Sequence, residues 1–214
     1  TTLFRSSNEF QYFINEYTSL STPKTFTLYD NSGKLVRVLE DNSTLINKVA
    51  GYAIQPKSFF KFKTSEGIEL NGWMIKPANF DENKKYPVMM TQYSGPNSQE
   101  VEDKWSVNWY NYLAQEGFLV ACVDSRGTGA RGEDFRKVTY MQLGKYESDD
   151  QIEAAKYLAT LPYVDASNIA IWGWSYGGLT SLLCMEKGGD IFKAGIAVAP
   201  VTHYKFYDSV YTER

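Results

Sequence analysis

The sequence predicts an α/β fold in which a mostly parallel, doubly wound sheet follows a short antiparallel β region. Two observations predict this order. Short strands separated by turns fill the first 40 residues, and from residue 86 onward apolar strands alternate with amphipathic helical segments. Alternation of this second kind places successive strands parallel to one another, with helices covering both faces of the sheet.

The first region contains three expected strands, at residues 10–17, 24–29 and 35–39. Asp30-Asn31-Ser32-Gly33 forms a turn between the last two. Three strands with aromatic side chains on both faces cannot bury those faces alone, so this meander is expected to belong to a larger all-β unit. The boundary with the next domain is expected near residues 44–52.

The second region begins with a hairpin whose strands span residues 58–63 and 68–75. A strand at 86–93, a helix from Trp105 to Gly117 and a strand at 118–123 then form a βαβ unit with a right-handed crossover. The pattern continues with a helix, a strand, a second helix and a short strand. These are expected at residues 147–160, 169–172, 175–188 and 196–199.

Composition narrows the classes of function. The chain of 214 residues has 22 Lys and Arg against 25 Asp and Glu, a formal charge of −3, and therefore no basic footprint for nucleic acid. It contains no apolar run of the roughly 18 residues that a membrane helix needs, and its polar start does not resemble a signal peptide. The sequence is expected to begin and end inside a longer protein.

The clearest chemical motif is Gly173-Trp174-Ser175-Tyr176-Gly177, which matches G-x-S-x-G. In this motif a sharp strand-to-helix turn lifts the serine hydroxyl clear of the sheet, and glycines allow the strand and helix to approach closely. The apolar strand before Ser175 and the helical segment after it provide the required context. The motif therefore predicts an α/β-hydrolase fold with Ser175 as its nucleophile, although a glycine turn with an incidental serine is the alternative.

Four motifs resemble those of dipeptidyl peptidase IV-like serine peptidases in the prolyl oligopeptidase family. Gly173–Gly178 resembles the nucleophile motif, Gln92–Pro96 the oxyanion loop, Asp124–Gly129 the strand-end motif and Tyr207–Arg214 the substrate-pocket helix. Together they span about residues 50–214. In that family a β-propeller caps the hydrolase domain. The resemblance thus implies that residues 1–50 are the end of the last propeller blade with a linker, and that residues 51–214 are the N-terminal part of the catalytic domain.

The resemblance also implies roles for individual residues. Ser175 would be the nucleophile, and the Tyr176 amide and the Tyr93 phenol would bind the tetrahedral oxyanion. Tyr207, Tyr211 and Val201 would line a shallow pocket for proline, because aromatic faces can stack against a flat ring. The alternative is that these tyrosines are ordinary core residues.

The catalytic triad is expected to be incomplete in this chain. α/β Hydrolases supply their acid and histidine after the serine, in that order. The single histidine, His203, directly follows the expected strand at 196–199, which is too early for the base, and Asp190 and Asp208 do not occupy the usual position of the acid. Both partners are expected beyond residue 214, and the chain alone is expected to be inactive.

The implied function is release of N-terminal dipeptides with proline or alanine at the penultimate position, through an acyl-enzyme on Ser175 and without a metal or organic cofactor. The implied partners are peptides beginning Xaa-Pro or Xaa-Ala, and the parent protein is expected to be periplasmic, secreted or membrane-anchored and a candidate homodimer. Three alternatives remain open. They are an acyl-peptide hydrolase or esterase of the same fold, a non-catalytic binding relative, and dinucleotide binding at Gly127–Gly132, which matches G-x-G-x-x-G.

Overall fold

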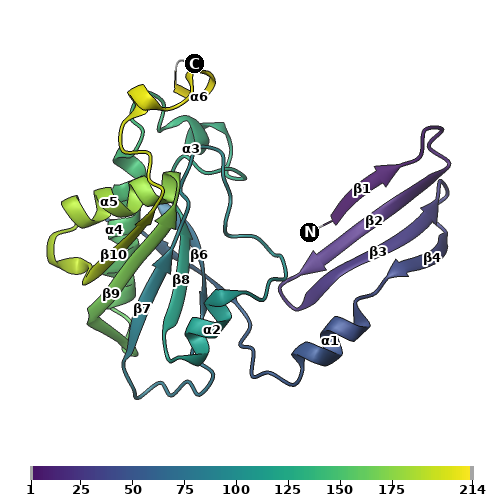
Figure 1. Ribbon diagram of the computed structural model, residues 1–214, viewed down its shortest axis with the longest axis horizontal. Helices are drawn as coiled ribbons and strands as arrows, with labels where there is room; N and C mark the ends of the chain where they lie inside the picture. Colours follow the sequence, from purple (N-terminus) through teal and green to yellow (C-terminus); the bar gives the residue numbers. More distant parts are fainter. Residues whose placement is uncertain (1, 213–214) are drawn as a thin grey trace.

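The computed structural model describes residues 2–212, which form two separate sheets (Figure 1). The first is an antiparallel meander with four strands in chain order, β1 (Thr2–Ser6), β2 (Tyr12–Ser19), β3 (Thr22–Asp30) and β4 (Leu35–Glu40). The predicted strands correspond to β2, β3 and β4. β1 was not predicted, because its segment has no periodic apolar pattern. The predicted turn is present, since Asp30 Oδ1 accepts the amides of Ser32 and Lys34, and Gly33 has a φ of 84°.

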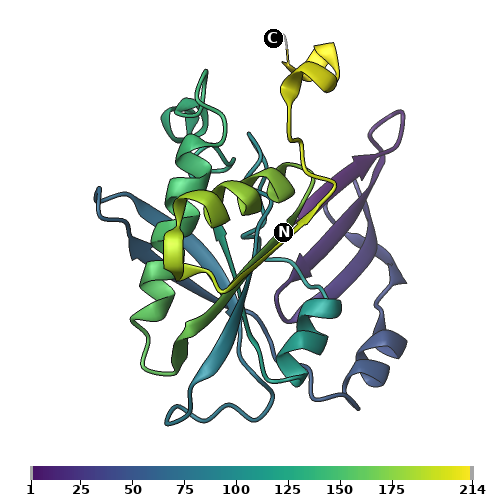
Figure 2. The same ribbon diagram turned by 60° about the vertical axis from the view of Figure 1, so that its left-hand side comes forward.

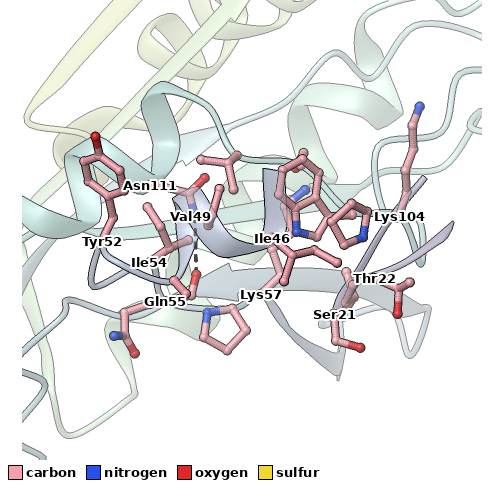
Figure 3. Close-up of a pocket in the computed structure, with 17 residues that line it drawn as sticks. Ser21, Thr22, Ile46, Val49, Tyr52, Ile54, Gln55, Lys57, Lys104 and Asn111 are labelled. Atoms are coloured by element: carbon pink, nitrogen blue, oxygen red, sulfur yellow. Dashed lines mark hydrogen bonds between the residues drawn. The ribbon is translucent and has the colours of Figure 1, made fainter. Parts of the chain in front are cut away.

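A short helix, α1 (Ser43–Val49), joins the two sheets, where only a domain boundary was predicted. None of its residues is buried. Beside it, a cavity of about 530 Å³ separates the antiparallel sheet from the α/β part (Figure 3). The Leu20 amide donates to Asp103 Oδ1 across this junction, and within the cavity wall the Asn111 amide group donates to the Gln55 carbonyl at 3.3 Å. The junction between the two sheets therefore combines a few hydrogen bonds with an open cavity whose wall includes the apolar side chains of Ile46, Val49 and Trp105.

The second sheet has the order β10-β9-β7-β8-β6-β5. β5 (Ser58–Lys63) and β6 (Glu69–Ile75) form the predicted antiparallel hairpin, and β6 also runs antiparallel to β8 (Leu119–Asp124). The remaining neighbours are parallel: β8 with β7, β7 with β9, and β9 with β10. Their bounds are Tyr86–Thr91 for β7, Val164–Trp174 for β9 and Ala194–Val198 for β10.

Helices cover both faces of this sheet, as Figure 2 shows. α4 (Lys145–Ala159) and α5 (Tyr176–Lys187) pack on one face over the larger apolar core. α2 (Trp109–Gln115) packs on the other face over a smaller core around Trp73 and Val120. The shorter helices are α3 (Glu133–Lys137), η1 (Gly189–Ile191), η2 (Tyr204–Phe206) and α6 (Ser209–Thr212). This arrangement confirms the predicted fold class. Across residues 2–212, no helix has the length and apolar character required to cross a membrane.

The helix predicted from Trp105 begins only at Trp109, so its predicted start was wrong. Asn108 ends the preceding loop, because its side chain accepts the Tyr110 amide while the Asn111 side chain accepts the Asn108 amide. This reciprocal pair is a capping box, which fixes a helix start more strongly than apolar spacing does. The Trp105 amide instead donates to Thr18 Oγ1 of the antiparallel sheet.

Candidate active site

Ser175 lies at a sharp turn between β9 and α5. β9 ends at Trp174, α5 begins at Tyr176, and Ser175 between them has φ 58° and ψ −117°. Its amide donates to the Val198 carbonyl at 2.9 Å, which ties the turn to the neighbouring strand β10. A positive φ at a residue with a side chain costs on the order of 1–3 kcal/mol and persists only where surrounding structure enforces it. The strained strand–turn–helix geometry expected for the motif is therefore present.

The glycines of the motif allow the end of β7 to pack directly against the turn. A Cβ atom at Gly173 would lie 2.3 Å from the Gly177 carbonyl oxygen, and one at Gly177 would lie 2.5 Å from the Gln92 carbonyl oxygen. Gln92 occupies the space that results, where its Nε2 donates to the Gly177 carbonyl at 2.7 Å and to Ser181 Oγ at 3.1 Å. Side chains at either glycine would force these backbone segments apart.

The two candidate oxyanion donors meet at the same edge of the sheet. Because β7 and β9 are parallel neighbours, their carboxyl ends bring Tyr93 and Ser175 to one side of the molecule. The Tyr176 amide is in the first turn of α5, where backbone N–H groups have no partner within the helix. The rings of Tyr93 and Tyr176 lie 6.3 Å apart, and the Tyr93 side chain is 38% exposed. A Cβ atom at Gly177 would lie 3.2 Å from Tyr93 Cα, so the Tyr93 loop packs against the start of α5, and the roles of the two donors stay predictions.

The Tyr176 side chain points away from solvent and is only 2% exposed. Its phenol donates to Glu147 Oε1 at 2.6 Å. Burial first, and then the charge of Glu147, raise the pKa of the Tyr176 phenol, which therefore stays protonated. The side chain anchors the start of α5, and the backbone amide remains the group available to a ligand.

The candidate pocket residues follow β10. Tyr207 and Tyr211 pack edge to face with ring centroids 5.4 Å apart, and Val201 is partly buried between β10 and η2. The pKa of Tyr211 is raised to about 12, chiefly by burial and then by the nearby Tyr204, Tyr93 and Tyr207. Tyr211 therefore lies near Tyr93, and the roles proposed for these tyrosines stay predictions. The last two residues of the predicted pocket motif, at 213–214, lie outside the described residues.

A cavity at this end of the molecule includes one of the three predicted pocket residues. It has a volume of about 600 Å³ and is lined by Tyr204 and Tyr211 on one side and by Tyr140 and Met141 on the other. Of the three predicted pocket residues, only Tyr211 contributes to its wall. A pocket formed by Tyr207, Tyr211 and Val201 together is therefore a prediction that this cavity does not reproduce.

His203 has the surroundings of a loop residue. It is exposed, its Nδ1 accepts the Lys205 amide at 3.1 Å, and its ring packs against Phe206. Within residues 2–212 no hydrogen bond joins it to Ser175. Asp208 accepts the Tyr211 amide at the start of α6, and Asp190 lies in η1. Among these same residues, no group of three or more His, Cys, Asp or Glu side chains is arranged to hold a metal ion.

The glycine-rich segment after β8 is bonded to the residues that directly follow the predicted oxyanion loop. The amides of Gly127 and Gly129 donate to the carbonyls of Phe135 and Ser98, and the Gly127 carbonyl accepts the Asn97 amide. The helix that follows, α3, has only five residues. Because the loop amides are already bonded to protein groups, this segment does not present the phosphate cradle that the dinucleotide alternative requires.

A group of buried polar residues on α4 was not identified from the sequence. Glu147, Ser148, Asp150 and Gln151 are all completely buried. Asp150 pairs with Arg126, whose Nη2 lies 2.7 Å from Asp150 Oδ1, and Arg126 also donates to Glu66. The only sequence feature that could have indicated these residues is a polar run at the start of an amphipathic helix. Such a run does not distinguish a buried polar face from a solvated one.

The chain matches proteins of one family along its length. The prolyl oligopeptidase family model matches residues 105–214. A protein of Trichophyton verrucosum named probable dipeptidyl-aminopeptidase B is 42% identical over 207 residues, which are 95% of this chain and 23% of that protein. One of Emericella nidulans named probable dipeptidyl peptidase 4 is 41% identical, over 95% of this chain and 27% of its own length.

A solved structure shows the same relation. The crystal structure of Porphyromonas gingivalis dipeptidyl peptidase 4 is 54% identical in sequence and superposes with a TM-score of 0.97, over 100% of this chain and 30% of that chain. This chain thus spans about a quarter of the length of these curated relatives. The strained serine turn, the sheet order and these matches agree, and the chain belongs to the prolyl oligopeptidase family.

Proposed function

We propose that the protein carrying this chain is a serine exopeptidase that releases N-terminal dipeptides with proline or alanine at the penultimate position. Ser175 is its nucleophile, and the scissile carbonyl binds with its oxygen toward the Tyr176 amide and the Tyr93 phenol. The names of the relatives support a dipeptidyl peptidase. The edge-to-face aromatic pair of Tyr207 and Tyr211 supports selection of a small, flat ring.

In the proposed reaction, Ser175 Oγ attacks the carbonyl carbon and forms a tetrahedral intermediate. Its negative charge develops on the carbonyl oxygen, where two preorganised donors stabilise it more than they stabilise the planar substrate. Collapse of the intermediate expels the shortened peptide as an amine and leaves the dipeptide as an ester on Ser175, which water then hydrolyses. A histidine base is required to take the Ser175 proton and to return it to the amine.

The observation that carries this proposal is the positive φ of Ser175 between β9 and α5. A fluorophosphonate probe tests it, because such a probe reacts only with an activated serine. We expect the complete gene product to be labelled and the Ser175→Ala variant to be unlabelled, while cleavage of a Gly-Pro chromogenic substrate is lost in parallel. Labelling that survives in Ser175→Ala would contradict the proposal.

We further propose that the 214-residue chain alone is nearly inert. Its single histidine accepts the Lys205 amide, and within residues 2–212 no hydrogen bond joins that histidine to Ser175. Loss of the triad partners lowers the rate by several orders of magnitude, although oxyanion stabilisation leaves a low residual activity. Cleavage of the Gly-Pro substrate by this chain at the rate of the complete enzyme would overturn this part of the proposal.

Two other functions share some of these features. An acyl-peptide hydrolase or esterase would use Ser175 without an aromatic proline pocket, and a non-catalytic relative would bind peptides without a reactive serine. Comparison of Gly-Pro, acetyl-Ala and simple ester substrates distinguishes the first alternative from a dipeptidyl peptidase. The fluorophosphonate experiment distinguishes the second. We also propose a periplasmic, secreted or membrane-anchored location and a homodimeric assembly for the complete protein, which cell fractionation and light scattering would test.

A further inference from the structure

The start of α4 presents a buried polar face to the candidate active site. Glu147 and Gln151 are both completely buried and lie one helical turn apart, so their side chains project from the same face of the helix. Buried polar groups destabilise a protein unless hydrogen bonds compensate them. The partners of these two side chains therefore indicate why the residues are polar.

Glu147 holds the residue that follows the candidate nucleophile. Its carboxylate accepts the Tyr176 phenol at 2.6 Å in a fully buried contact. A hydrogen bond from a hydroxyl to a carboxylate is shorter and stronger than one between neutral groups. The contact ties the side chain of Tyr176 to α4, and so limits rotation of the first turn of α5, where the Tyr176 amide lies.

Gln151 holds the loop that carries the other candidate donor. Its Nε2 donates to Ser94 Oγ at 3.2 Å and to the Val123 carbonyl at 2.8 Å, and both contacts are buried. Ser94 directly follows Tyr93 and has a φ of 62°, a left-handed conformation that needs support from its surroundings. Gln151 thus links the Tyr93 loop to the end of β8.

We propose that Glu147 and Gln151 are positioning residues that together set the geometry of the two oxyanion donors. Glu147 acts on the Tyr176 amide through the Tyr176 side chain, and Gln151 acts on the Tyr93 phenol through Ser94. This inference rests on the proposed function of Ser175. Because both residues belong to one rigid helix, the two donors keep a constant separation even though they come from segments more than 80 residues apart.

A role in stability alone would be served as well by apolar residues. Replacing a whole buried polar pair by apolar residues of similar volume is often neutral or stabilising, whereas removing one partner costs stability. A positioning role makes a different demand, since donors misplaced by about 1 Å can cost about 10²-fold in rate. The two roles therefore predict different results when the polar atoms are removed and the volume is kept.

The experiment uses the complete enzyme with Glu147→Met and Gln151→Met, which keep side-chain length and remove the hydrogen bonds. We expect kcat for a Gly-Pro anilide to fall by about 10²-fold in each variant, with KM changed by less than about threefold. A dipeptide boronate, whose adduct with serine is tetrahedral, should lose affinity by the same factor. Binding of the product dipeptide, whose carboxylate is planar and does not reproduce the tetrahedral oxyanion, should change less than binding of the boronate.

Two further variants sharpen the test. Glu147→Gln keeps an acceptor for the Tyr176 phenol and should stay within about fivefold of the wild-type kcat, because an amide oxygen still accepts a hydrogen bond. Tyr86→Phe is a matched control, since it removes a phenol that accepts the Asp81 amide at 2.8 Å near the start of β7, at the opposite end of the sheet from Ser175. It should leave kcat and boronate affinity unchanged.

Undiminished kcat and boronate affinity in the two Met variants would overturn the inference, as would equal losses for boronate and product dipeptide. If the Met variants do not fold, Tyr176→Phe carries the test, because it removes the same hydrogen bond from the other side and keeps the amide. Wild-type boronate affinity in Tyr176→Phe would then overturn the role of Glu147. An enzyme that fluorophosphonate does not label at Ser175 would instead contradict the proposed function itself.

Discussion

β4 and β8 are both strands of six residues and both begin with Leu-Val, yet β4 is exposed along its whole length and β8 is buried along its whole length. β8 lies between β7 and β6 and has α2 packed against it. β4 is an edge strand of the antiparallel sheet, and nothing in residues 2–212 covers it. Apolar composition alone therefore does not make a core, and the candidate site is built on the strands that are covered.

The largest expected difference between the two regions is in the loss of unfolding free energy when an ion pair is broken. Asp150→Ala leaves Arg126 buried without its main partner, and loss of one member of a buried pair costs about 3–5 kcal/mol of unfolding free energy. Glu16→Ala removes a partly exposed pair with Lys24 on the antiparallel sheet and should cost less than about 1 kcal/mol. Urea unfolding followed by circular dichroism measures both.

Tryptophan fluorescence sharpens this measurement. All five tryptophans lie between residues 73 and 174, so their emission reports the α/β part and, through Trp105, its junction with the antiparallel sheet. Asp150→Ala should shift the fluorescence transition to lower urea, and Glu16→Ala should leave it in place. A fluorescence shift in Glu16→Ala that equals its circular dichroism shift would mean that the two sheets unfold as one unit.

A smaller difference in unfolding free energy is expected when the leucines that begin β8 and β4 are each replaced by alanine. Leu119 is 0% exposed and Leu35 is 49% exposed. Leu119→Ala should cost about 2–5 kcal/mol, because it removes apolar contacts and leaves a cavity. Leu35→Ala should cost less than about 0.5 kcal/mol, as is usual for surface positions. A loss above 2 kcal/mol for Leu35→Ala would show that the face of β4 is covered in solution.

The smallest expected effect is a pH dependence at Asp124, where β8 ends. Burial raises the pKa of this carboxyl above 3.8, although the amides of Glu100 and Val101 oppose the shift. The native state then binds the proton more tightly than the unfolded chain does. The contribution of Asp124 to the free energy of unfolding therefore falls as pH rises from about 3.8 through the native pKa. Below that range it is fully present.

Asp124→Asn removes this titration and keeps an acceptor for the two amides. Relative to the wild type, the variant should gain stability as pH rises from about 3.5 to about 7. Urea midpoints measured across this range test the expectation. A difference between variant and wild type that does not vary with pH would contradict it.

Most of the fold could be predicted because its elements carry local signals. The hairpin from residue 58, the parallel strands and the helices α4 and α5 each have a clear apolar period, and the turn at Ser175 has a sequence motif. β1 and the start of α2 could not be predicted in the same way. β1 depends on pairing with β2, and α2 begins where the side chains of Asn108 and Asn111 bond reciprocally.

The candidate site was predicted unevenly for a similar reason. Ser175, Tyr93 and Tyr176 belong to short motifs, and the parallel pairing of β7 and β9 brings them together. Glu147 and Gln151 belong to no motif, since their partners are 29 and 57 positions away in the sequence. Whether a polar helix face is solvated or bonded internally depends on tertiary contacts, which a pattern within one segment does not contain.

The backbone conformation of Ser175 has a consequence for the energetics of the whole molecule. Glycine adopts a positive φ without steric cost, so Ser175→Gly should melt at a higher temperature than Ser175→Ala. The backbone conformation at position 175 thus favours a residue without a side chain, although the proposed chemistry needs a hydroxyl there. Packing against the neighbouring strands holds Ser175 in this strained backbone conformation. The proposed activity is therefore maintained at a cost in thermal stability.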